Sequence, residues 1–380
     1  MDNRSAGFVK LRNTAGMRMV DYYLVVPVLV MTIIGLYVLQ RVLSNGYAAY
    51  PGNYYRQIVA TLVGVFIAIC ICILDTHFLK MVGRLIYAAS LMLLLLVPID
   101  GYSLKSTWGA DSWLNLPVIG NFQPSELAKI GLVLVVADIL ESMAEKKVSM
   151  LKGLGMIAGV YAPPMLLILL QPDFGTAMVI MFTFVCMLFA WGIKYRYFLL
   201  AISSAVVIVI PAVWTFYLED YQKNRILSLV FQGSDPRSEY NLKQSQAAIM
   251  SGGLTGNHTG ILTSVPVKES DFIFAAISEH MGFIGTTTVI IMAFFFICRC
   301  LYVANKVPSR SSAYILSGLA GYFAFHYIEN MGMAVGLLPI TGIPLPFISL
   351  GGTAQLINFI AFGIILNISM SRSVNTGGNT

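Results

Sequence analysis

Long apolar runs separated by short polar segments recur along the whole chain. A run of about 17 to 23 apolar residues, at ~1.5 Å per residue, can cross the ~30 Å hydrocarbon core of a bilayer as a helix. We count ten such runs, a few of them shorter: Tyr22 to Gln40, Ile58 to Leu74, Phe78 to Val97, Leu127 to Leu140, Leu154 to Leu170, Thr176 to Trp191, Tyr197 to Tyr217, Gly282 to Ala304, Ala313 to Val335 and Gly352 to Met370. The pattern predicts an all-α polytopic membrane protein with about ten transmembrane helices. Because no internal repeat or flexible linker divides the chain, we expect a single domain over residues 1–380.

Composition agrees with this class and excludes others. Of the 380 residues, 57% are hydrophobic and only 11% are charged, whereas roughly a quarter of an ordinary soluble domain is charged. This balance excludes a soluble enzyme and a disordered chain. The cysteines lie in or at the edge of apolar runs, so we interpret them as packing residues: Cys70, Cys72, Cys186, Cys298 and Cys300. The net charge is +6. In a membrane protein, basic residues first of all set the orientation in the bilayer, so we expect no nucleic-acid partner.

The basic residues predict the orientation. With the N-terminus inside, the cytoplasmic segments carry 15 Lys and Arg against 3 in the short external loops, as the positive-inside rule requires. Both termini are then cytoplasmic. Two long segments lie outside, Ile99 to Ser125 and Leu218 to about Met281. The second is a large extracellular loop between the seventh and eighth helices, in which we expect re-entrant or surface-lying helices.

Polar residues at the outer ends of the apolar runs are candidates for function, because a charge at membrane depth costs about 2.5 to 3.5 kcal/mol on insertion scales. Glu126 and Lys129 share one helix face at the start of the fourth run. They form either a site or a local ion pair at a helix start. Asp173 lies in a tight turn, where a helix cap with Thr176 is an alternative explanation.

Asp271 ends the long external segment and opens an apolar helix, with Glu279 two turns deeper. Capping of that helix is again the alternative to a functional role. A loop rich in proline and glycine precedes the last run and contains Pro344, Pro346 and Ser349. Such apolar backbone is tolerated at membrane depth where it lines a cavity or packs on protein. These groups converge on the outer face and fit either transport or chemistry on an amphiphilic substrate.

At these residues the chain resembles the SEDS family (shape, elongation, division and sporulation) along nearly its whole length. The matching motifs, in order, are Gln123 to Lys129, Gln171 to Thr176, Ser251 to Gly256, Asp271 to Ala275 and Thr341 to Ser349. The stretch Asp220 to Arg225 and the pair Gln244 and Ser245 resemble the RodA-like branch. The chain departs from the usual family pattern at Glu269, Ser270 and His280 beside the aspartate, and at Met250 and His258.

The resemblance implies polymerisation of lipid II, the undecaprenyl-diphosphate-linked disaccharide peptide, into glycan strands at the outer face of the bacterial cytoplasmic membrane. It also implies a class B penicillin-binding protein as the transpeptidase partner. The family's essential aspartate falls on Asp271, which is the expected catalytic residue. The expected substrate-binding residues are Glu126, Lys129, Asp173, Arg225, Ser251, Gly252, Gly253, Glu279, Pro344, Pro346 and Ser349.

The reaction joins a sugar hydroxyl to an anomeric carbon and displaces a lipid diphosphate, so it needs a base and a positive charge. We expect Asp271 to be the base, with Glu269 as a near neighbour. Arg225, Lys129 or a divalent cation (Mg²⁺ or Mn²⁺) would neutralise the diphosphate, and no organic cofactor is expected. A lipid II flippase and a non-catalytic scaffold for cell-wall synthases remain alternatives. Transport predicts polar residues continuing into the inner half, where Asp138 is almost alone.

Overall fold

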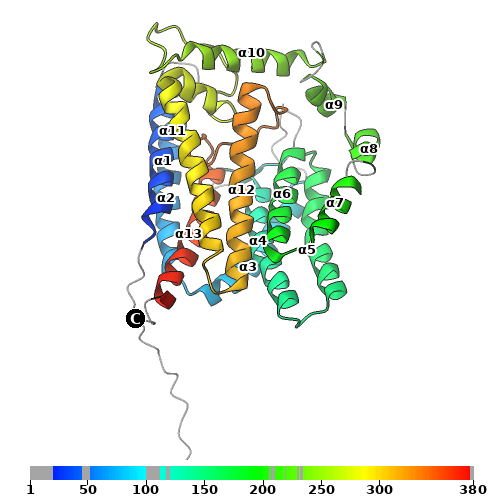
Figure 1. Ribbon diagram of the computed structural model, residues 1–380. Coiled ribbons are helices and arrows are strands. Elements are labelled where there is room, and N and C mark those ends of the chain that lie inside the picture. The colour runs from blue at the N-terminus through cyan, green and yellow to red at the C-terminus, as the bar shows by residue number, and fades with distance from the viewer. Residues whose placement is uncertain are drawn as a thin grey trace, which may run out of the picture.

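Helices that run roughly side by side form the body of the protein in the computed structural model (Figure 1). The structure describes residues 20–44, 52–99, 112–116, 120–204, 207, 210–218, 220–228, 231 and 234–376. All but the seventh of the predicted apolar runs correspond to a long helix. These helices are α1 (Tyr22–Ser44), α2 (Gly52–Ile73), α3 (Thr76–Leu96), α4 (Pro124–Ala144), α5 (Met150–Leu170), α6 (Phe174–Trp191), α11 (Ile273–Ala304), α12 (Arg310–Val335) and α13 (Gly352–Thr376).

Within the described ranges, seven helices are long and apolar enough to cross a membrane: α1, α2, α3, α5, α6, α11 and α13. Helices α4 and α12 are also long enough, with 21 and 26 residues, but they carry more polar side chains. Both are largely buried, and α12 packs against α4, α6 and α11. The polar residues of α4 and α12 therefore lie inside the bundle, where neighbouring helices can bind them.

The seventh predicted run, Tyr197 to Tyr217, is not one regular helix. Its described residues form α7 (Tyr195–Ser204), the single turn α8 (Ile210–Ala212) and the π-helical segment η2 (Val213–Tyr217). Pro211 lies in α8, where a proline removes one backbone donor and interrupts helical hydrogen bonding. The hydroxyl of Thr215 donates back to the Pro211 carbonyl at 2.7 Å. The described part of this run is therefore helical but irregular.

The segment between this region and α11 contains short helices. Helix α9 (Asp220–Leu227) is followed by α10 (Pro236–Ser251), which lies across one end of the bundle (Figure 1). Asp235 caps α10 by accepting from the backbone N–H groups of Arg237 and Ser238. Helix α11 is broken at Gly282, where φ is 63° and ψ is −160°. A short arm before Gly282 thus turns into a long spanning helix.

A small hairpin departs from the all-helical prediction. Strands β1 (Leu114–Leu116) and β2 (Gly120–Phe122) pair antiparallel, with Leu114 opposite Phe122. The hydroxyl of Thr353 donates to the carbonyl of Asn121 at 2.8 Å, which fixes the hairpin to the start of α13. Pairing satisfies backbone groups that a loop packed on the bundle would otherwise leave without partners.

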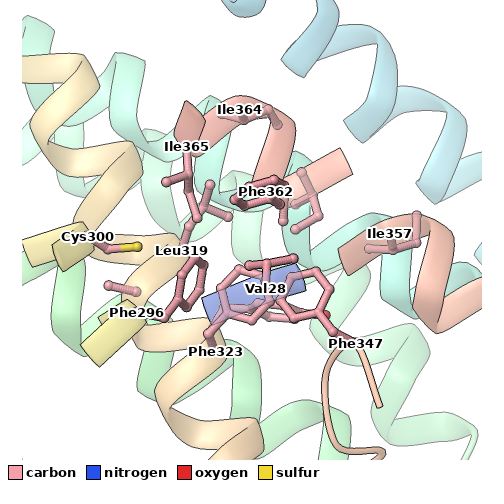
Figure 2. Close-up of a cluster of buried hydrophobic side chains, with 14 of the residues drawn as sticks. Val28, Phe296, Cys300, Leu319, Phe323, Phe347, Ile357, Phe362, Ile364 and Ile365 are labelled. Carbon is pink, nitrogen blue, oxygen red and sulfur yellow. The ribbon is translucent and has the colours of Figure 1, made fainter. Parts of the chain in front are cut away.

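The loop between α12 and α13 is fixed to the core by Phe347. Figure 2 shows this side chain among residues of α1, α11, α12 and α13. Its ring stacks on Phe323 at 5.4 Å and meets Phe296 edge-on at 6.2 Å. Phe347 is 1% exposed, so an aromatic side chain that buries a large apolar area holds the loop in place. This confirms that the loop packs on protein.

The beginning of α1 and the end of α13 meet at one end of the bundle. Arg299 near the end of α11 forms a two-pronged ion pair with Asp21, the closest contact being 2.8 Å. The same carboxylate accepts the hydroxyl of Ser369 at 2.9 Å. In Figure 1 the C-terminal end of α13 lies opposite the end that α10 covers.

Candidate functional site

The backbone around Asp271 is held by three donors from α12 and the loop that follows it. Residues 269–271 present consecutive carbonyl groups. The backbone N–H of Leu350 donates to the first at 2.9 Å, the hydroxyl of Ser349 to the second at 2.7 Å, and the amide of Asn330 to the third at 2.8 Å. Ser349, a predicted site residue, thus contacts the segment that carries Asp271.

The side chain of Asp271 is half-buried and lies beside a glycine. Its Oδ1 accepts the hydroxyl of Ser270 at 2.9 Å. A Cβ placed on Gly342 would lie 3.3 Å from Oδ2, and Gly342 has a φ of 76°, a conformation that glycine adopts without strain. The N-cap of α11 is Phe272, whose side chain makes no capping hydrogen bond. Asp271 therefore precedes the N-cap position of the helix.

Glu126 and Lys129 form a buried ion pair inside the bundle. Each side chain is at most 4% exposed, and the Lys129 Nζ donates to the Glu126 Oε1 at 2.8 Å. The same ammonium lies 3.3 Å from the Nε2 of His326 and 5.3 Å from the centre of the Tyr322 ring. The Tyr322 hydroxyl lies 2.8 Å from the Oδ1 of Asn358 and 3.4 Å from the Glu126 Oε2. The pair belongs to a network that extends across α4, α12 and α13.

One face of α12 connects this network to Asp271. Tyr322, His326 and Asn330 follow one another at intervals of four residues, which places them on the same helix face. Since an ammonium only donates, the His326 Nε2 accepts from Lys129 and its Nδ1 carries a proton, which it donates to the Pro344 carbonyl at 3.2 Å. The sequence analysis missed all three α12 residues, although their four-residue spacing was visible.

Asp173 behaves as a helix cap. Its Oδ1 accepts the backbone N–H of Thr176 at 3.0 Å, and its Oδ2 accepts the side-chain amide of Gln123 at 3.0 Å. Helix α9 reaches the same turn, because the amide of Gln222 donates to the Pro172 carbonyl at 3.3 Å. Arg225 lies on α9, but its side chain is outside the described residues.

Glu279 forms a second buried ion pair, with a lysine that the sequence analysis did not identify. The side chains of Glu279 and Lys268 are 0% and 3% exposed and bind each other directly. Glu279 also accepts the backbone N–H of Thr263 at 2.6 Å, and Lys268 donates to the Thr263 carbonyl at 3.0 Å. The pair fixes the segment that leads to Asp271 against the short arm of α11.

The glycine motif after α10 packs against the same arm. A Cβ on Gly252 would lie 1.8 Å from the carbonyl oxygen of Ser278, so only glycine permits this approach. Gly253 has a φ of 52° and nothing within 4 Å of a Cβ placed on it. Ser251 is exposed and bonds back to Ala248, whereas Pro346 is buried. Contact of these residues with substrate stays a prediction.

A divalent cation would need several oxygen ligands close together. Among the residues that the structure describes, no group of three or more His, Cys, Asp or Glu side chains is placed to hold a metal ion. The Glu126 carboxylate is already bound to Lys129. The Mg²⁺ or Mn²⁺ expected from the sequence stays a prediction, and we assign no step of the reaction to it.

Curated relatives match most of the chain. The peptidoglycan glycosyltransferase MrdB of Escherichia coli (strain K12) is 33% identical over 76% of this chain and 78% of its own length. The stage V sporulation protein E of Bacillus subtilis (strain 168) is 30% identical over 83% of this chain and 86% of its own length. The probable peptidoglycan glycosyltransferase FtsW of Escherichia coli O6:H1 is 32% identical over 82% of this chain and 76% of its own length.

Solved structures match the fold. The rod shape determining protein RodA of Thermus thermophilus is 28% identical with a TM-score of 0.67, covering 93% of this chain and 97% of that one. A chain from a structure described as a peptidoglycan synthase complex that coordinates polymerization and crosslinking is 29% identical, with a TM-score of 0.76 and coverage of 93% and 98%. The family model described as "Cell cycle protein", for FtsW, RodA and SpoVE, matches residues 18–374. The chain therefore belongs to the SEDS family of FtsW, RodA and SpoVE proteins, with a RodA-like type.

Proposed function

We propose that this protein is a membrane-embedded peptidoglycan glycosyltransferase that polymerises lipid II into glycan strands for cell shape, elongation or a specialised wall-synthesis process. The relative MrdB is named a peptidoglycan glycosyltransferase, and the relative FtsW is named a probable one. The structural observation that carries the proposal is the set of three hydrogen bonds that hold the backbone carbonyls of residues 269–271. It holds one half-buried carboxylate in a fixed position, which is what a general base requires.

Asp271 accepts the proton of the acceptor sugar's 4-hydroxyl. The hydroxyl oxygen then forms a bond to the anomeric carbon of the donor, and the bond from that carbon to the diphosphate breaks. The undecaprenyl diphosphate leaves with the electron pair, and the proton remains on Asp271 until it passes to solvent. Gly342 leaves one side of the carboxylate without a side chain, which gives the acceptor hydroxyl an approach.

The positive charge at the leaving diphosphate is proposed to come from α9. This helix carries Lys223 and Arg225 and contacts the turn before α6 through Gln222. Lys129, the other expected cation, is 3% exposed and occupied by Glu126 and His326. Its proposed role is to fix α12 and the loop at Pro344, through His326, rather than to meet the diphosphate directly.

The flippase alternative requires a polar path towards the inner half of the bundle. Between Lys129 and Asp138 every residue of α4 is apolar or glycine, and all but Val135 are buried. At ~1.5 Å per residue this apolar layer is about 12 Å thick. Beyond this layer, Asp138 and Glu141 near the C-terminal end of α4 form ion pairs with Lys80 near the N-terminal end of α3. This arrangement supports chemistry at one face over transport through the bundle.

We place the protein in the bacterial cytoplasmic membrane, with both termini in the cytoplasm and the Asp271 site on the outer face. Asp21 before α1 binds Ser369 near the end of α13 and Arg299 near the end of α11. These contacts support placing both termini on the same side of the membrane. A class B penicillin-binding protein is the proposed partner that crosslinks the strands. The similarity to a chain of a synthase complex that coordinates polymerization and crosslinking supports it.

Incubation of the purified protein and its partner with lipid II, followed by separation of the glycan strands, tests the proposal. Wild type should make strands, and Asp271→Asn should fold equally well and lose about 10²-fold or more of the rate, as expected for removal of a general base. Asp235→Asn makes the same chemical change at the cap of α10 and should keep the rate. An active Asp271→Asn protein would contradict the catalytic role of Asp271, whereas a wild-type protein that makes no strands would favour a scaffold.

A further inference from the structure

Glu329 on α12 is a buried carboxyl group to which no role has been assigned above. Its side chain is 3% exposed. The Oε1 atom accepts the hydroxyl of Thr341, whereas Oε2 is shielded from solvent and has no hydrogen-bond partner. A buried ionised oxygen without a partner carries a large desolvation cost. Oε2 therefore requires either a proton or a cation.

The nearby carboxyl group is that of Asp271. The two side chains are close enough to interact electrostatically. They flank the same stretch of loop, because Glu329 binds Thr341 and the Asp271 Oδ2 lies beside Gly342. Asn330, the neighbour of Glu329, donates to the carbonyls of Asp271 and Ile343, both at 2.8 Å. Helix α12 thus brings a second acid to the site of the proposed base.

Apart from His280, the basic groups on the elements packed against this part of α12 have other partners or are exposed. On α4, α6 and the α11 arm, Lys129 binds Glu126, Asp173 caps a helix, and Lys268 binds Glu279. The other charged and histidine side chains at this end of the bundle include Arg237, Glu239, Lys243, Glu269, His280 and His326. His326 is bound by Lys129 and Pro344, and Arg237 and Lys243 are exposed. None of the ion pairs among the described residues involves Glu329.

We propose that Glu329 is a positioning residue that shares one proton with Asp271, its Oε2–H donating to the Asp271 carboxylate. This inference rests on the proposed function. Two adjacent carboxyl groups do not both ionise readily, so the pair keeps one proton and titrates as a unit. When Asp271 takes the proton of the acceptor hydroxyl, the pair holds two protons. One of them leaves to solvent through the half-exposed Asp271 before the next cycle.

The pH dependence of the polymerisation rate distinguishes three variants. Glu329→Gln keeps a donor towards Asp271, so its rate near neutral pH should stay within about threefold of wild type, while the fall at alkaline pH disappears. Glu329→Met removes the donor, and the fall at acidic pH should move up by about one pH unit, as expected for loss of a hydrogen bond to a charged group. Glu145→Gln is the control, because Glu145 is exposed and lies at the far end of α4 from Glu126, and it should reproduce the wild-type profile. Glu329 variants with the profile of Glu145→Gln would overturn the inference.

An infrared measurement on the purified protein tests the shared proton without activity. Wild type at neutral pH should show the C=O band of a protonated carboxylic acid, which Glu329→Gln removes and Glu145→Gln keeps. Asp271→Asn should shift the band. If Asp271→Asn leaves the band at the wild-type position, the two residues do not share a proton. If wild type lacks the band, and Mn²⁺ stabilises wild type but not Glu329→Gln, then Oε2 binds a cation instead. Because failure of the glycosyltransferase assay in wild type leaves the band unchanged, the two failures are distinguishable.

Discussion

The side-chain amide of Asn330 donates a 2.8 Å hydrogen bond to the backbone carbonyl of Asp271. These residues are 59 positions apart in the sequence, and the contact fixes the proposed base to α12. The same amide also donates to the carbonyl of Ile343. A single side chain therefore sets the distance between the Asp271 segment and the loop beside it.

Replacement of Asn330 by Ala should reduce the polymerisation rate by about tenfold or more and lower the thermal stability in detergent. Two buried carbonyl groups lose their donor, at about 1 to 3 kcal/mol each. Asn305→Ala is the control, since Asn305 is exposed and bonds only within its own helix turn. If Asn330→Ala retained the wild-type rate, the amide would not be needed to position Asp271.

Much of the fold could be predicted because membrane depth imposes a simple rule on sequence. Apolar runs located α1 to α6 and α11 to α13, and the start of the eighth run coincides with the break at Gly282. The π-helical segment Val213–Tyr217 was not anticipated, because hydropathy alone does not report local hydrogen bonding. The hairpin β1 and β2 was missed since three-residue strands give no periodic signal.

The candidate site could be predicted only where one segment carries both partners. Glu126 and Lys129 are three residues apart, and their pairing was visible on one helix. The bond between Asn330 and Asp271 and the approach of Glu329 depend on tertiary packing. Long-range contacts of this kind leave no spacing in the sequence. The polar face of α12 had a signal, but the helix was interpreted only as an apolar run.

Exchange of the charges of Glu126 and Lys129 should abolish polymerisation and destabilise the protein. The swapped lysine would meet the hydroxyl of Tyr322, and the swapped glutamate would face His326, which then loses its donor. Charges misplaced in a buried network cost several kcal/mol. The measurement is the amount of folded protein in the membrane together with its activity on lipid II.

The exposed pair Glu145 and Lys147 provides the control for this exchange. The Lys147 Nζ and a Glu145 carboxylate oxygen are 2.5 Å apart, but the side chains of Glu145 and Lys147 are 40% and 71% exposed. The corresponding exchange should change stability by less than about 1 kcal/mol, as for other surface ion pairs. A swap of Glu126 and Lys129 with an equally small effect and a near-normal rate would restrict both residues to a local ion pair at a helix start.

The pair of Lys268 and Glu279 should behave as one unit in a double-mutant cycle. Lys268→Met leaves a buried carboxylate without its cation, which is expected to cost about 3 to 5 kcal/mol. Combining it with Glu279→Gln removes the uncompensated charge and should recover part of the stability. Unfolding in detergent gives the coupling, and strictly additive losses would show that the two residues do not depend on each other.

Accessibility of introduced cysteines should place α10 and the two termini on opposite sides of the membrane. Asp21, Arg299 and Ser369 join the start of α1, the end of α11 and the end of α13 at the bundle end away from α10. The 15 cytoplasmic basic residues against 3 in short external loops assign that end to the cytoplasm. In a background without the 5 native cysteines, an impermeant thiol reagent applied to intact cells should label Ile261→Cys, since Ile261 is 80% exposed. The same reagent should leave Thr380→Cys unlabelled until the membrane is permeabilised. Labelling of Thr380→Cys in intact cells would reverse the orientation and move the Asp271 site to the cytoplasmic face.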